Sequence, residues 1–117
     1  MVPVRQKRQA FDVEKYQAIH AEVTRLQEIS FIREAQYPQW ISNVVMVEKA
    51  NGKWRMCVDF KNLNNACPKD NFPLSGIDQL VDATAGYELL SRMDAYLGYN
   101  QIRMELADHE ATTFITD

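Results

Sequence analysis

The stretch SNVVMVEKANGKWRMCVDF, residues 42–60, decides the fold of this chain. Its first part, residues 43–47, is rich in β-branched side chains and predicts a strand. Asn51 and Gly52 then give a strong hairpin-turn signal, because both residues tolerate positive φ. The return segment alternates, with Trp54, Met56 and Val58 on one side and Arg55, Cys57 and Asp59 on the other. The pattern predicts a β-hairpin.

Cations gather on this hairpin although the chain as a whole is acidic. Residues 48–69 hold five Lys or Arg against two acidic residues, whereas the net charge is −3 and the pI about 5.4. A protein that coats nucleic acid by bulk charge would have a domain pI above about 9. Lys49, Lys53 and Arg55 would lie near the tip or on one face, which suits a triphosphate or a nucleic-acid backbone. A solvated hairpin surface accounts for these charges equally well.

The composition is that of an ordinary globular domain. Of the 117 residues, 46% are hydrophobic and 25% charged, which is enough apolar material for a core. No apolar run reaches the roughly 18 residues of a membrane-spanning helix, so no membrane partner is expected. Cys57 and Cys67 have no nearby His, which argues against zinc and favours two reduced thiols, with a disulfide left open.

Two helices and a loop are predicted around the hairpin. Asp12 is a candidate N-cap for a helix over about 12–29, where apolar residues recur at helical spacing. Ser75 and Asp78 resemble a capping box and predict a short helix that ends at Ala85-Gly86. The Asn-rich segment 61–72 predicts a loop.

The last third of the chain predicts further strands. Residues 87–94 form an apolar run that predicts a buried strand ending at Asp94, and residues 101–106 alternate as another strand. Residues 108–112 predict one helical turn, and residues 113–116 open a last strand. We expect the strands around 87–94 and 113–116 to be antiparallel, because no helix of crossover length lies between the later strands.

Asp94 is the residue in this region with the clearest chemistry. A rigid strand end would hold its metal-binding oxygen, Gly98 would let the backbone approach a ligand, and the Tyr99 ring would shape a pocket. A polymerase active site needs this arrangement, although a lone Asp after a strand is more often a cap or a surface residue. The remaining candidates have turn, cap or surface interpretations: Asp59, Asp78, Asp82 and Asp108.

Several stretches together resemble a known family over nearly the whole chain, from about Pro3 to Asp117. They are Phe31-Ile32-Arg33-Glu34, Tyr37-Pro38, 43–47, 51–60, Leu63-Asn64, Phe72-Pro73-Leu74, 77–80, 93–102 and 113–116. They resemble the N-terminal part of a reverse transcriptase of the Ty3/Gypsy long-terminal-repeat retrotransposon type, closest to elements of plant genomes. In such elements the polymerase lies within a Gag-Pol polyprotein with protease, RNase H and integrase.

The resemblance implies a fold and a division of the chain. It implies an α+β, partial right-hand polymerase fold with an N-terminal arm and helix at 1–30. The fingers would span 31–86, and the start of the antiparallel palm sheet would span 87–117. Without the resemblance, the residues predict only a small α+β domain with a phosphate-binding hairpin.

The resemblance also implies a site for two-metal nucleotidyl transfer. It assigns the triphosphate arginine to Arg55, and the triphosphate lysine to Lys49 with an alignment that is uncertain by one residue. It assigns the first metal-binding catalytic aspartate to Asp94, and the backbone near the phosphates to Ala95, Tyr96 and onward to Gly98. The ring against the sugar 2′ position is assigned to Tyr99. The complete enzyme would use two Mg²⁺ ions, an RNA or DNA template-primer and deoxynucleoside triphosphates. Its location would be intracellular, in a cytoplasmic particle or the nucleus.

The sequence also departs from the family. It has no aromatic-x-Asp-Asp motif, and the final Phe114-Ile115 pair suggests truncation. The partners would be the remaining palm, the thumb and RNase H, and the chain alone is expected to be inactive. Smaller departures are Ser30 in place of Gly, Arg92 beside Met93 and Ala111 in place of Lys. The alternative is a non-catalytic nucleic-acid-binding or interaction remnant of a decayed element.

Overall fold

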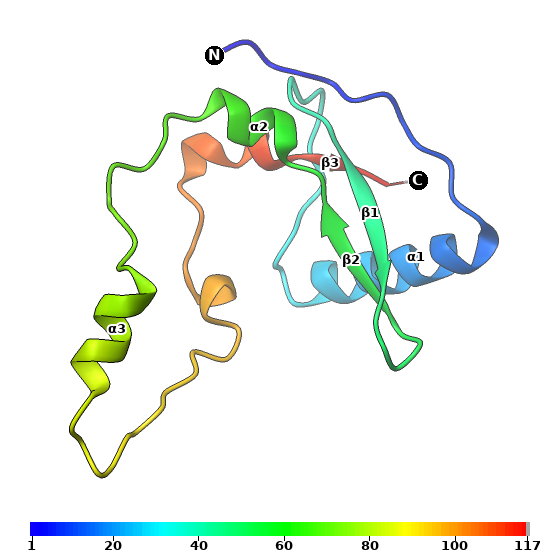
Figure 1. The fold of residues 1–117 in the computed structure, drawn as a ribbon. Coiled ribbons are helices and arrows are strands. Elements are labelled where there is room, and N and C mark those ends of the chain that lie inside the picture. The colour runs from blue at the N-terminus through cyan, green and yellow to red at the C-terminus, as the bar shows by residue number, and fades with distance from the viewer. Residues whose placement is uncertain (117) are drawn as a thin grey trace. The chain divides into compact units, whose positions relative to one another are not determined.

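The computed structural model describes residues 1–116 (Figure 1). The chain forms two compact units. The first, called here the sheet unit, comprises Met1–Cys67 and the described residues from Met104 onward. The second, the α3 unit, comprises Pro68–Arg103. The elements of the sheet unit are α1 (Val13–Glu28), β1 (Ser42–Glu48), β2 (Trp54–Val58), α2 (Lys61–Ala66), η2 (Leu106–Asp108), η3 (Glu110–Thr112) and β3 (Phe114–Ile115). The α3 unit holds α3 (Ile77–Thr84) and η1 (Gly98–Gln101).

The predicted hairpin is confirmed. β1 and β2 pair in antiparallel register from Val44 opposite Val58 to Glu48 opposite Trp54. At the turn, the Gly52 amide donates to the Lys49 carbonyl at 2.9 Å. Gly52 has a φ of +74°, while Asn51 is not in the positive-φ region. The turn therefore needs the conformational freedom of glycine at one position and not at two.

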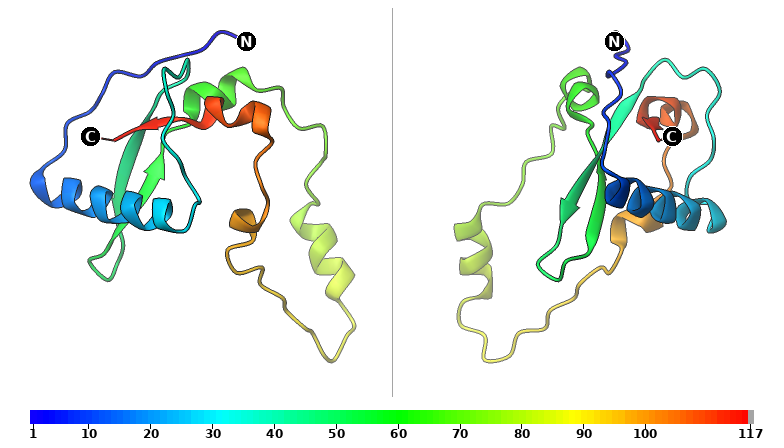
Figure 2. Two further views of the ribbon diagram at one scale, coloured as in Figure 1. Left: turned by 180° about the vertical axis from the view of Figure 1, so that it is seen from behind. Right: turned by 90° about the vertical axis from the view of Figure 1, so that its right-hand side faces the viewer.

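The predicted N-terminal helix is also confirmed. Asp12 is its N-cap, and the Asp12 Oδ1 accepts a hydrogen bond of 2.9 Å from the Lys15 amide. This bond satisfies one of the four amides that a helix start leaves without an internal partner. The helix lies across one face of the hairpin (Figure 2), and Ile19 on its inner side is only 5% exposed.

The third strand corrects a prediction. The sheet order is β2-β1-β3, and β3 pairs with β1 in parallel, with Ser42 opposite Phe114. The expected antiparallel arrangement for residues 113–116 is therefore wrong. A parallel neighbour requires a long connection. The chain between Glu48 and Phe114 provides one that contains β2, α2 and α3 instead of one crossover helix. The helical turn expected at 108–112 is present as η2 and η3.

Residues 61–72, predicted as a loop, begin instead with helix α2. The N-cap of α2 is Phe60 without a side-chain hydrogen bond, and the Lys61 amide donates to the Asp59 Oδ1 at 3.1 Å. Leu63 within the helix is only 8% exposed. Burial of Leu63 offsets the weak helix propensity of the Asn residues around it. Tertiary contacts thus decide this segment.

The α3 unit contains the predicted short helix but lacks the predicted strands. The N-cap of α3 is Gly76 without a side-chain hydrogen bond, so the Ser75–Asp78 capping box does not form. The helix ends at Thr84, with Ala85 as its C-cap, and Gly86 follows at a φ of +83°. Residues 87–94 and 101–106 form no strand. A strand needs a neighbour to pair its backbone groups, and neither segment pairs with another described residue.

The core of the sheet unit lies where the N-terminal arm meets the base of the hairpin. Its buried apolar side chains are Ile19, Trp40, Val44 and Leu63. Gln6 binds β1 and the residue that follows β2: its Oε1 accepts from the Asn43 amide at 2.7 Å, and its Nε2 donates to the Asp59 carbonyl at 3.1 Å. The Asn43 Nδ2 donates to the Lys7 carbonyl at 2.9 Å. No described helix has the length and apolar character needed to cross a membrane.

Candidate functional site

The outer face of the hairpin presents the predicted cations. Arg55 lies opposite Val47, and Cys57 lies opposite Val45. Along β2 these outward residues are exposed, while Trp54, Met56 and Val58 are partly covered, as the alternation predicts. Cys57 and Cys67 are free and exposed thiols.

Lys49 and Arg55 line one open hollow next to the turn. The complete lining is Val47, Glu48, Lys49, Ala50, Asn51 and Arg55. The Arg55 guanidinium makes no hydrogen bond or ion pair within residues 1–116. A planar guanidinium and a nearby ammonium are the groups that suit a phosphate chain. Lys53 lies outside this hollow, so only two of the three hairpin cations share it.

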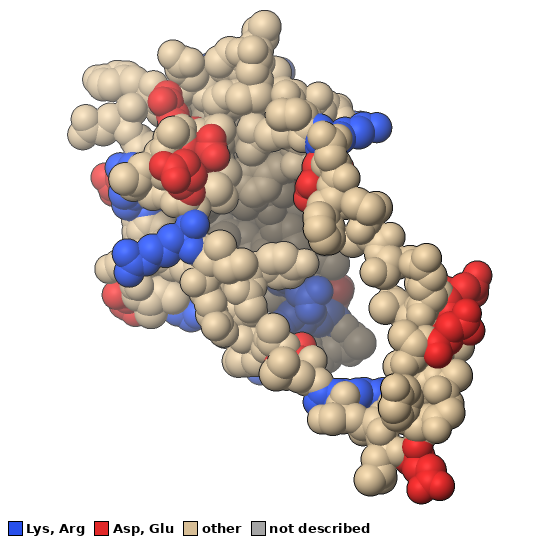
Figure 3. Space-filling model, turned by 90° about the vertical axis from the view of Figure 1, so that its left-hand side faces the viewer, with Lys and Arg blue, Asp and Glu red and all other residues tan. Residues whose placement is uncertain are grey.

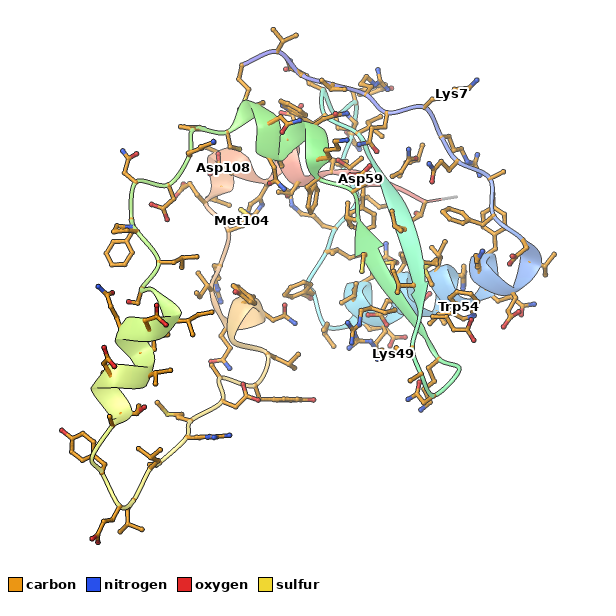
Figure 4. All side chains as sticks on the ribbon, in the orientation of Figure 1. Lys7, Lys49, Trp54, Asp59, Met104 and Asp108 are labelled. Atoms are coloured by element: carbon orange, nitrogen blue, oxygen red, sulfur yellow. The ribbon has the colours of Figure 1, made fainter. Side chains whose placement is uncertain are left out.

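Helix α1 brings acidic groups close to the hairpin. The pKa of Glu22 is held below its ordinary value, first because Arg25 donates to it, with Nη2 2.6 Å from Oε1, and to a smaller extent because of the charge of Lys49. Lys49 (labelled in Figure 4) therefore lies in the electrostatic field of α1. Exposed charges of this kind interact weakly, so a more highly charged anion could compete for Lys49.

The segment that carries Asp94 forms a tight series of turns in the α3 unit. The Tyr96 amide donates to the Asp94 carbonyl at 3.0 Å, and the Gly98 amide donates to the Ala95 carbonyl at 2.8 Å. A Cβ added to Gly98 would lie 3.0 Å from the Ala95 Cβ, which is closer than ordinary contact. Glycine thus permits this close approach.

The predicted site residues of this segment are exposed at its surface. Asp94 is exposed and follows no strand, so the expected strand-end position is wrong. Its carboxylate makes no hydrogen bond or ion pair with the residues that the structure describes. Tyr96 is 79% and Tyr99 95% exposed. Side chains of both tyrosines and the carboxylate are therefore available to a ligand.

The α3 unit is acidic where the hairpin is basic. It contains five acidic residues, Asp70, Asp78, Asp82, Glu88 and Asp94, and three basic ones, Lys69, Arg92 and Arg103. Figure 3 shows the acidic side chains along the part of the chain that carries α3. Among residues 1–116, no three His, Cys, Asp or Glu side chains come together in a way that could hold a metal ion. Asp94 could contribute one carboxylate to a site that other groups complete.

One feature near the hollow was not predicted. Trp54, next to Arg55, hydrogen-bonds Glu14 of α1 and lies beneath the Lys15 ammonium. The sequence contains only an indirect signal, since Trp54 falls on the face expected to be covered. No local spacing relates residue 14 to residue 54.

Comparison with known proteins identifies the family. The family described as "Reverse transcriptase (RNA-dependent DNA polymerase)" matches residues 47–117. The Retrovirus-related Pol polyprotein from transposon 412 of Drosophila melanogaster is 28% identical over 84% of this chain. The Transposon Tf2-3 polyprotein of Schizosaccharomyces pombe is 30% identical over 86% of it. An RNA-directed DNA polymerase homolog of Oenothera berteroana is 32% identical over 53% of this chain and 44% of its own length.

The chain covers only a small part of the length of these polyproteins. It spans 8% of the Drosophila polyprotein and 7% of the Schizosaccharomyces polyprotein. The α+β architecture with a three-stranded mixed sheet agrees with a part of a polymerase domain. The chain belongs to the reverse transcriptase (RNA-dependent DNA polymerase) family, as part of the reverse transcriptase domain of a retrotransposon polyprotein.

Proposed function

We propose that this chain supplies the fingers and the first palm segment of a Ty3/Gypsy-type reverse transcriptase that copies an RNA or DNA template. In this proposal residues 1–30 are the arm and first helix, residues 31–86 the fingers and residues 87–117 the start of the palm. The observation that carries the proposal is the hollow shared by Lys49 and Arg55, whose guanidinium has no hydrogen-bond or ion-pair partner among residues 1–116. It suits the triphosphate of an incoming deoxynucleotide.

The two cations would have different tasks. Phosphoryl transfer depends mainly on positioning and on neutralising charge spread over the phosphate oxygens. The Arg55 guanidinium can donate two parallel hydrogen bonds to phosphate oxygens, which fixes their orientation. Lys49 adds a compact charge on a flexible stem. Together they would hold the triphosphate while the primer reacts.

The second part of the proposed site is the turn series around Asp94. The Asp94 carboxylate, which has no partner among the described residues, is the kind of oxygen ligand that Mg²⁺ prefers. Asp94 would hold part of a Mg²⁺ pair, whose chemistry when bound would be to activate the primer 3′-hydroxyl and to neutralise charge on the leaving pyrophosphate. The backbone at Ala95 and Tyr96 would approach the phosphates, and the Tyr99 ring would exclude a ribose 2′-hydroxyl.

One carboxylate does not complete such a site. Mg²⁺ requires near-octahedral oxygen coordination, and residues 1–117 contain no adjacent pair of aspartates. We therefore propose that catalysis requires the remaining palm with its aromatic-x-Asp-Asp motif, and that the thumb and RNase H of the polyprotein are further partners. Residues 1–117 alone should extend no primer, even at high Mg²⁺.

Primer extension tests the proposal in a polypeptide that joins residues 1–117 to the remaining palm and thumb. Asp94→Asn should lower kcat by about 100-fold or more, because a group acting on transition-state charge is lost. Asp82→Asn, an equal charge change in α3, is the matched control. Full activity of Asp94→Asn, or extension by residues 1–117 alone, would contradict the two-metal assignment.

Nucleotide kinetics test the remaining residues in the same polypeptide. Arg55→Ala should raise the KM for deoxynucleotides by about tenfold, the value of one lost charge-assisted hydrogen bond pair. Lys61→Ala, which removes an equal charge outside the hollow, should leave KM unchanged. Tyr99→Val should mainly increase ribonucleotide incorporation. A polypeptide that binds template-primer but extends nothing in any variant would favour the non-catalytic remnant.

A further inference from the structure

Trp54 joins the hairpin to helix α1 by two polar contacts. Its Nε1–H donates to the Glu14 Oε1 at 3.2 Å, and the Lys15 Nζ lies 5.4 Å from the centre of its ring. Lys15 is itself paired with Asp12, the N-cap of α1, at 3.5 Å. In Figure 4 Trp54 is labelled where β2 passes α1. The indole is thus held from its polar edge and from its face.

The position of Trp54 relates this contact to the cationic hollow. Successive strand residues point to opposite faces, so Trp54 points toward α1 while Arg55 points into the hollow. Trp54 also lies opposite Glu48, whose next residue is Lys49. Fixing the Trp54–Glu48 pair therefore fixes the backbone one residue away from each phosphate-binding cation.

We infer that the first turn of α1 acts as a strut for the nucleotide site, with Glu14, Lys15 and Trp54 as positioning residues for Arg55 and Lys49. The inference rests on the proposed function of the hollow. It gives a role to a helix that lies outside residues 47–117, the part matched by the family. The strut touches no substrate; it limits the motion of the end of the hairpin that carries the cations.

The strut is not what folds the hairpin. The other end of the hairpin is held by buried Val44 and by the hydrogen bonds that Gln6 makes to Asn43 and Asp59. An exposed hydrogen bond and an exposed cation–π contact each contribute only a small part of the stability of a folded domain. Loss of the strut should leave the fold intact and the cationic end less well positioned.

The test measures deoxynucleotide kinetics in the extension-competent polypeptide that contains these residues. Glu14→Ala and Trp54→Phe should each raise the KM about threefold with kcat unchanged, because each removes the hydrogen bond between Trp54 and Glu14. Phe keeps an aromatic ring but has no N–H donor. The double variant should be no worse than either single variant, since both remove the same bond. Glu14→Gln keeps an acceptor oxygen and should restore the KM. Glu28→Ala, on the same helix without a side-chain partner among the described residues, is the control.

Hydrogen exchange supplies a readout that is independent of nucleotide. In Glu14→Ala, the Lys49 and Gly52 amides of the turn should exchange faster, while the Asn43 amide at the base should not change. An unchanged KM and unchanged exchange in Glu14→Ala and Trp54→Phe, beside a raised KM in Arg55→Ala, would overturn the strut alone. An unchanged KM in Arg55→Ala would overturn both the proposed nucleotide site and the strut. If Glu14→Ala lowers both the stability of the protein and kcat, the contact serves folding and not the positioning of the cations, and the inference is also overturned.

Discussion

The two units of this chain show what a short sequence can and cannot stabilise. The sheet unit buries Val44 to 1% exposure and packs α1 and the N-terminal arm against its hairpin. In the α3 unit, every residue of Pro68–Arg103 except Gly98 is exposed. The difference teaches that turns and short helices form from local bonds, whereas strands need a neighbour.

The exposed side chains of the α3 unit are largely apolar. Five of them exceed 80% exposure: Phe72, Leu74, Leu89, Met93 and Tyr99. Exposed apolar surface on this scale is typical of a surface that contacts another part of a protein. The rest of the palm would cover it under the proposed function. The candidate metal ligand, Asp94, thus belongs to the unit that depends most on its surroundings.

The largest expected difference between the units is in the free energy of unfolding lost when an apolar side chain is truncated. Val44→Ala in the 117-residue chain should lower the free energy of unfolding by about 2 kcal/mol, because transfer energy is lost and a cavity remains. Leu89→Ala, at 91% exposure, should change it by less than about 0.5 kcal/mol. Urea unfolding followed by circular dichroism measures both. Equal effects would mean that the α3 unit has a core of its own.

The same contrast explains which predictions from sequence succeeded. The turn at Gly52 and the N-cap at Asp12 depend on neighbours within a few residues, so their signals were sufficient. Residues 87–94 have the composition of a strand, but composition does not supply a pairing partner. The α2 helix was missed for the opposite reason, because Leu63 is buried by tertiary contacts that no local pattern shows.

The candidate site divides in the same way. The shared position of Lys49 and Arg55 follows from hairpin register, which turn chemistry and alternation predict. The Trp54–Glu14 contact joins residues forty positions apart, and only the packing of α1 creates it. For Asp94, sequence resemblance indicates a role, and the fold of these residues alone provides an exposed turn. The roles of Asp94, Ala95, Tyr96 and Tyr99 stay predictions.

A second, smaller difference in unfolding free energy should appear when a glutamine of each unit is replaced by alanine. Gln6→Ala leaves the buried Asn43 amide without its partner at 2.7 Å and should cost about 1–2 kcal/mol of unfolding free energy. Gln79→Ala, on exposed α3, should have almost no effect. Denaturant unfolding of the two variants measures the difference. A neutral Gln6→Ala would show that the arm does not hold the hairpin base.

Two glycines with positive φ provide a third comparison. Gly52 and Gly86 have φ values of +74° and +83°, and a Cβ would meet nothing within 4 Å at either. Each Gly→Ala change therefore tests backbone strain alone, about 1 kcal/mol. Gly52→Ala should lower the Tm of the cooperative transition, while Gly86→Ala should affect only the end of α3. A lowered Tm in both variants would show that the units unfold together.

The smallest expected effect is a pH dependence confined to α1. A hydrogen bond from the Lys15 amide lowers the pKa of Asp12 from its ordinary value, and one from the Arg25 side chain lowers the pKa of Glu22. Because the folded pKa values are depressed, their stabilisation is present above the unfolded values and is lost as the pH falls through the folded ones. Helix α3 has the N-cap Gly76, which has no side chain to titrate. Helical circular dichroism between pH 6 and pH 3 should therefore fall slightly, and Asp12→Asn, which keeps a capping oxygen, should reduce that fall. An identical pH profile in Asp12→Asn would remove the Asp12 carboxylate as a source of the effect.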